Sequence, residues 1–142
     1  MTEHELAALK SMLTLHEGRM LFVYNDSLGV PTIGVGRNLR DKGISPSECD
    51  LLLENDIADV LEALTHQFPW FSTALNSARQ LALVDMGFMG PEKLRGFHKM
   101  IAAIQRGDFQ QAAREMLDST WAQQVGHRAV DLAAIMRDGV LK

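Results

Sequence analysis

The sequence has little of several features that mark specialised classes of protein. It contains one cysteine, Cys49, so no disulfide can form within the chain and nothing requires an oxidising compartment. No apolar run approaches the roughly 20 residues that a membrane-spanning helix needs. Positive charge is not in excess, because 14 Lys and Arg residues stand against 18 Asp and Glu residues. The basic footprint of a nucleic-acid-binding domain is therefore absent.

The remaining composition is that of an ordinary folded domain. Hydrophobic residues make up 46% of the 142 residues and charged residues 23%, which is inside the usual globular range. A chain of this length can form one core that buries roughly 68 to 70% of its unfolded surface. Residues 1–5 lack the basic and apolar stretches of a secretory signal. We expect a soluble domain that is released into the cytosol.

Two capping boxes mark the starts of two helices. Thr2 and Glu5 have the spacing of the first box, and the apolar residues after them predict a helix from about Glu3 to Glu17, ended by Gly18. Ser45-Pro46-Ser47-Glu48 is the second box. The apolar stripe behind it predicts a long helix of about 20 residues.

The segments around these helices indicate the fold class. Residues 21–24 and 31–35 are short β-leaning runs around a turn-rich segment, which predicts a β-hairpin. After the second box we expect only helices, around residues 77–89, 92–106, 109–118 and 127–138. The fold is thus α+β and mainly α. Its predicted parts are a small N-terminal lobe (about 18–44), a long connecting helix (about 45–66), and a helical lobe (about 67–142) that includes the N-terminal helix.

Three polar residues of the N-terminal third have a chemically suggestive arrangement. Glu17 ends a predicted helix, Asp26 lies in the hairpin turn and Thr32 lies on the returning strand. Taken singly, each residue has a simple structural explanation: Glu17 is a solvated helix end, Asp26 a turn former and Thr32 a β-branched strand residue. Together they can reach one cleft wall, and two carboxylates that flank a glycosidic bond are the minimum for its acid/base hydrolysis.

A longer motif around these residues is specific to one family. Glu17-Gly18-Arg19 followed by Tyr24-x-Asp26-x-x-Gly29-x-x-Thr32-Ile33-Gly34-x-Gly36 closely resembles the signature of phage-type lysozymes, the T4 lysozyme class of glycoside hydrolase family 24. The resemblance covers nearly the whole chain. It continues at Asp56, at Gly96-Phe97 and along Trp121-x-x-Gln124-x-x-x-Arg128-Ala129.

The resemblance implies a function and a lysozyme-like fold. Glu17 would be the general acid, and Asp26 with Thr32 would position the attacking water, in an inverting hydrolysis of the β-1,4 bond between N-acetylmuramic acid and N-acetylglucosamine. The protein would be a muramidase and a phage or prophage endolysin, with the peptidoglycan glycan strand as its partner and no cofactor. Such an enzyme stays in the host cytoplasm until a holin opens the membrane, and it then acts in the periplasm.

Other matching positions imply supporting roles. Residues 85–89 align with a stretch where the family often has an asparagine or glutamine that faces the cleft; Phe88 matches the family and would contact substrate, whereas Met89 does not match. Arg128 is expected to approach Glu17 from the helical lobe, and Gln124 lies in the same matching run.

One departure falls at the end of the motif. Arg37 stands where the family usually has a histidine that pairs with an aspartate. We expect Arg37 to pair with Asp56 on the long helix and to support the structure, because a guanidinium grips a carboxylate with two parallel bonds.

Two alternatives remain open at this stage. The chain can be a non-catalytic peptidoglycan-binding or assembly domain of the same fold, or a lytic transglycosylase. The presence of Glu17, Asp26 and Thr32 argues against the first, and the water-positioning pair argues mildly against the second. The five histidines are scattered without ligand-type spacing, which argues against a metal site. We expect a monomer.

Overall fold

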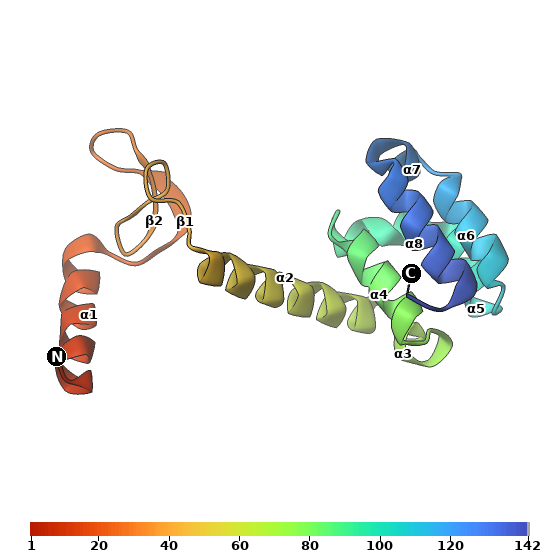
Figure 1. The fold of residues 1–142 in the computed structure, drawn as a ribbon, viewed down its shortest axis with the longest axis horizontal. Coiled ribbons are helices and arrows are strands. Elements are labelled where there is room, and N and C mark those ends of the chain that lie inside the picture. The colour runs from red at the N-terminus through yellow and green to blue at the C-terminus, as the bar shows by residue number, and fades with distance from the viewer. Residues whose placement is uncertain (142) are drawn as a thin grey trace. The chain divides into compact units, whose positions relative to one another are not determined.

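The computed structural model describes residues 1–141, which divide into two compact units near Leu52 (Figure 1). The N-terminal unit contains α1 (Glu3–Glu17), three strands and the start of the long helix α2 (Pro46–Gln67). The helical unit contains the rest of α2 and seven further helical elements. The expected α+β and mainly α fold class is therefore confirmed.

Both predicted capping boxes are formed. In the first, Oγ1 of Thr2 accepts from the Glu5 N–H at 3.1 Å and the Glu5 carboxylate accepts from the Thr2 N–H at 3.1 Å. This satisfies two of the backbone donors that a helix start leaves without an intrahelical partner. Helix α1 ends, as predicted, where the Gly18 N–H donates to the carbonyl of Thr14.

The predicted hairpin is present and gains a third strand. Strand β1 (Met20–Asn25) pairs antiparallel with β2 (Pro31–Gly34), so that Tyr24 lies opposite Thr32. Strand β3 (Arg37–Asn38) then pairs antiparallel with β2 and places Asn38 opposite Thr32. The sequence does not predict β3, because two residues are too few to show an alternating pattern.

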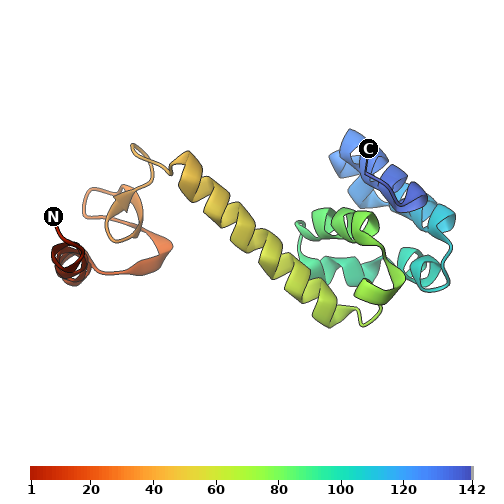
Figure 2. The same ribbon diagram turned by 60° about the horizontal axis from the view of Figure 1, so that its bottom comes forward.

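The helical unit holds nearly all of the described core, and Figures 1 and 2 both show α4 to α8 gathered in one bundle. Its elements after α2 are α3 (Phe71–Ala74), α4 (Ser77–Gly87), the 3-10 helix η1 (Pro91–Gly96), α5 (His98–Gln105), α6 (Phe109–Leu117), α7 (Thr120–Val125) and α8 (His127–Asp138). Helix α8 packs against α4, α6 and α7. The largest fully buried side chains are Leu64, Phe71, Leu83, Met86, Leu94, Met100, Ile104, Met116 and Met136.

The predicted helix over residues 92–106 is two elements. The backbone of Phe97 has φ −84° and ψ 59°, outside the helical region, and it separates η1 from α5. The chain therefore turns at Phe97, and its ring packs against the core. Among residues 1–141 the structure contains no helix that is both long and apolar enough to cross a membrane.

Candidate active site

Asp26 is fixed by the backbone of its own turn. Its Oδ1 accepts hydrogen bonds from the N–H groups of Leu28, at 2.8 Å, and Val30, at 2.9 Å. This is the turn-closing geometry that aspartate favours. The other carboxylate oxygen, Oδ2, has no partner among the described residues, so it remains able to bind a water or a proton.

Thr32 is hydrogen-bonded to Val30, the residue whose N–H also binds Asp26. Its hydroxyl donates to the carbonyl oxygen of Val30 at 2.8 Å, and its side chain is buried in β2. Because that bond uses the hydroxyl hydrogen, Thr32 can meet a further group only as an acceptor. The structure thus brings Asp26 and Thr32 together around Val30, as the sequence analysis expects for a shared role.

Glu17 lies at the exposed end of α1, beside the turn between β2 and β3. A Cβ atom at Gly36 would lie 3.0 Å from Oε2 of Glu17 and 3.3 Å from its Cδ. The carboxylate therefore rests against a position where any side chain would crowd it. Within the N-terminal unit, residues 1–52, no residue gives this carboxylate a hydrogen bond. The predicted separation of Glu17 and Asp26 stays a prediction.

The expected pairing of Arg37 with Asp56 is wrong. The guanidinium of Arg37 instead grips Glu48, with Nη1 at 2.9 Å from Oε1 and Nη2 at 2.9 Å from Oε2. The short connection of residues 39–45 brings β3 to the first turn of α2, where Glu48 lies, and Asp56 is eight residues further along that helix. Asp56 is exposed.

Glu48 is at the same time the acid of the second capping box. It accepts from the Ser45 N–H at 2.8 Å, while the Ser45 hydroxyl accepts from the Glu48 N–H at 3.2 Å. The hydrogen bonds from Arg37 first, and then those from Ser45, lower the pKa of Glu48 from 4.5 to about 2. The box marks Glu48 in the sequence, but the spacing alone does not reveal its second partner.

This pKa predicts how the contribution of Glu48 to stability changes with pH. A carboxyl group whose pKa is lower in the folded state stabilises the fold above its unfolded value and loses that contribution as the pH falls through the folded value. We therefore expect the Tm difference between the natural protein and Glu48→Gln to be constant from pH 7 to about pH 5.5 and to shrink toward pH 3. Thermal melts across this range measure it. A difference that grows in acid would contradict the pairing.

Phe88 and Arg128, both predicted from the sequence to support the site, line the same pocket of the helical unit. Phe88 is 43% exposed, and the other walls of this pocket of about 710 Å³ are mainly apolar side chains of α2 and α4. Nε of Arg128 donates to Oδ1 of Asp85 at 2.8 Å, and its Nη2 also reaches the Asp85 carbonyl. The sequence analysis does not predict Asp85 as the partner. The expected approach of Arg128 to Glu17 stays a prediction.

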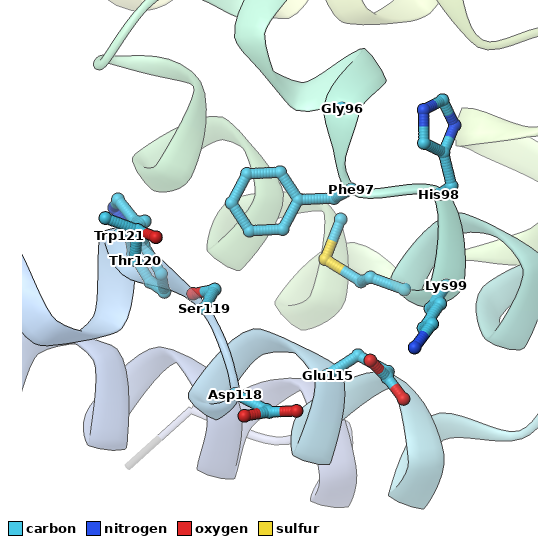
Figure 3. Close-up of a pocket in the computed structure, with 10 residues that line it drawn as sticks. Gly96, Phe97, His98, Lys99, Glu115, Asp118, Ser119, Thr120 and Trp121 are labelled. Atoms are coloured by element: carbon cyan, nitrogen blue, oxygen red, sulfur yellow. The ribbon is translucent and has the colours of Figure 1, made fainter.

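A second pocket of the helical unit, of about 500 Å³, carries more charge (Figure 3). Figure 3 shows the ring of Phe97 pointing into it, with Glu115 and Asp118 on the wall formed by α6 and the turn after it. Lys99 and His98 contribute its basic side. The Phe97 ring meets the buried Trp121 edge to face, with ring centres 6.4 Å apart. Gln124 is exposed on α7.

Residues 1–141 contain no group of three or more His, Cys, Asp or Glu side chains that could hold a metal ion. The N-terminal unit carries a carboxyl group at the end of α1, a carboxylate fixed in the hairpin turn and a hydroxyl on β2.

Comparison with known proteins gives a consistent family. The profile of the phage lysozyme family matches residues 14–137, a range that includes Glu17, Asp26 and Thr32. The chain is similar to two probable T4-type lysozymes of Dictyostelium discoideum, at 26% and 28% identity, over 96% of this chain and 97% and 98% of theirs. It is also similar, at 30% identity over 95% of its length, to the pre-baseplate central spike protein Gp5 of phage T4, and it spans 28% of that protein.

Proposed function

The chain belongs to the phage lysozyme family, and we propose that it is a peptidoglycan muramidase that hydrolyses the β-1,4 bond between N-acetylmuramic acid and N-acetylglucosamine with inversion of configuration. The family match and the two T4-type lysozyme relatives support a muramidase-like function. One observation supports the catalytic assignment most: Asp26 and Thr32 bind the N–H and the C=O of the same residue, Val30.

In the proposed reaction Glu17 acts first on the leaving group. Its carboxyl group donates a proton to the glycosidic oxygen as the bond to the anomeric carbon breaks. Its position at the exposed end of a helix leaves the carboxyl group accessible to a bound sugar. The leaving sugar departs with the proton, and Glu17 is left as a carboxylate.

Asp26 and Thr32 position and activate the attacking water. The hydroxyl oxygen of Thr32 accepts one hydrogen of the water, and the free Oδ2 of Asp26 accepts the other as the water oxygen attacks the anomeric carbon from the opposite face. The proton that the water loses passes to Asp26, so the proton given by Glu17 is balanced. An inverting enzyme needs its two carboxyl groups roughly 6.5 to 9.5 Å apart to make room for this water.

We further propose that the protein is a phage or prophage endolysin. It would remain in the host cytoplasm until a holin opens the membrane, and it would then meet peptidoglycan in the periplasm as a monomer. The T4 relative named as a spike protein is much longer than this chain.

The product of the reaction tests this function. Gram-negative cells with a permeabilised outer membrane are treated with the protein, loss of turbidity is followed, and the released muropeptides are analysed by mass spectrometry. We expect turbidity loss and reducing-end muropeptides, with intact cells unaffected as the control. Anhydro ends would show a lytic transglycosylase instead, and binding without release would show a non-catalytic domain.

A further inference from the structure

The exposed carboxylate of Glu17 needs something to hold it in place. A glutamate at a helix end can adopt many rotamers, and fixing such a side chain opposes its conformational entropy. A general acid contributes fully only when it is aligned with its target, and a misplacement of about 1 Å can cost about 10²-fold in rate. Within the N-terminal unit, residues 1–52, no side chain gives this carboxylate a hydrogen bond, and its end lies beside Gly36, where a Cβ atom would be 3.0 Å from Oε2.

The turn that carries Gly36 is itself held from the other side. Arg37 follows Gly36 directly, and its Nη1 donates one hydrogen bond to Oε1 of Glu48 and another, at 3.1 Å, to the carbonyl of Gly43, while its Nη2 forms an ion pair with Oε2 of Glu48. Glu48 is bound in turn to the backbone of Ser45 at the start of α2. A series of contacts therefore links Glu48, in the first turn of α2, through Arg37 on β3 to Gly36, beside which the Glu17 carboxylate lies.

We propose that Gly36 and the Arg37–Glu48 pair are positioning residues for Glu17: the pair fixes the turn, and the missing side chain at Gly36 leaves the space in which the carboxylate lies. This inference rests on the proposed function only for the role of Glu17 as an acid. The contact itself is a property of the fold and can be tested without substrate.

A matched pair of variants isolates the effect of the side chain at Gly36. Gly34 and Gly36 have nearly equal φ angles, +69° and +70°, so an alanine is strained to a similar degree at both. A Cβ at Gly34 meets nothing within 4 Å, whereas one at Gly36 meets the Glu17 carboxylate. With rates normalised to folded protein, we expect Gly36→Ala to lower kcat about 10-fold with little change in KM, because the carboxylate must shift by less than the 1 Å that costs about 10²-fold, and Gly34→Ala to lower it far less.

The second arm removes the ion pair while keeping the glycine. Arg37→Met and Glu48→Gln are each expected to lower kcat about 10-fold with KM unchanged, because the turn is less firmly held. Arg37→Lys should restore only part of the rate, since an ammonium cannot make the paired bonds of a guanidinium. Equal kcat values for Gly36→Ala and Gly34→Ala, or natural kcat in Arg37→Met, would overturn the proposal.

A stability cycle separates this inference from the proposed function. The Tm loss caused by Gly36→Ala should be smaller in a Glu17→Ala background, because the crowded carboxylate is gone, while the loss caused by Gly34→Ala should be the same in both backgrounds. Coupling at Gly36 combined with an active Glu17→Gln protein would keep the contact and refute the role of Glu17. Additive losses at Gly36 would refute the contact whatever the activity.

Discussion

Replacing Glu17 by glutamine is expected to lower turnover about 10²- to 10⁴-fold, the usual contribution of a general acid. An amide fills almost the same volume but has no proton of suitable acidity to give to a glycosidic oxygen. The fold should survive, because Glu17 is exposed and makes no hydrogen bond within the N-terminal unit, residues 1–52, that the change would break. The measurement is muropeptide release per folded molecule, with circular dichroism as the check on folding.

A matched control lies on the same helix. Glu3 is exposed in the first turn of α1, and Glu3→Gln makes the same chemical change far from the hairpin. We expect it to keep the natural rate. Folded Glu17→Gln protein with the natural rate, or an equal loss in both variants, would remove Glu17 from the catalytic assignment.

A large effect on stability is expected at Met116. This side chain is fully buried in α6, and truncating a buried methionine to alanine costs about 2 to 5 kcal/mol through lost burial and the cavity left behind. Helix α6 packs against both α5 and α8, so the cavity would open at the centre of the helical unit. Urea unfolding followed by circular dichroism measures the loss.

The neighbouring residue provides the comparison. Leu117, next to Met116 on the same helix, is 47% exposed, so Leu117→Ala should change the free energy of unfolding by no more than about 0.5 kcal/mol. Similar losses at the two positions would mean that the buried face of α6 has been assigned wrongly.

Helices whose ends are marked by capping residues can be predicted from the local sequence. The capping boxes at Thr2 and Ser45 predict the starts of α1 and α2, and Gly18 predicts the end of α1. The sequence does not predict the short elements β3, α3 and α7, because their two to six residues are too few to show a periodic pattern. Nor does it predict the break at Phe97, whose ring packs against core residues from other parts of the chain.

In the candidate site, too, contacts between residues close in the sequence could be predicted and contacts between distant residues could not. Asp26 and Thr32 are held by bonds to Val30, within a few residues, and a motif that short can be recognised in the sequence. The partner of Arg37 depends on which turn of α2 lies next to β3, and this is set by the length of the loop between them. A carboxylate on the long helix is predicted correctly, but it is Glu48 and not Asp56. The contact of Glu17 with Gly36 joins a helix to a turn across the hairpin, and the glycine alone does not reveal what it accommodates.

The place of α8 in the chain affects how the protein matures. Helix α8 is synthesised after α4, α6 and α7, the elements it packs against, so their shared core cannot close until α8 has emerged from the ribosome. A premature stop codon or a proteolytic cut between α7 and α8 would leave Glu17, Asp26 and Thr32 in place. It would remove the buried Leu132 and Met136 and expose the faces they cover, so such a fragment would be a substrate for degradation with its chemical groups intact.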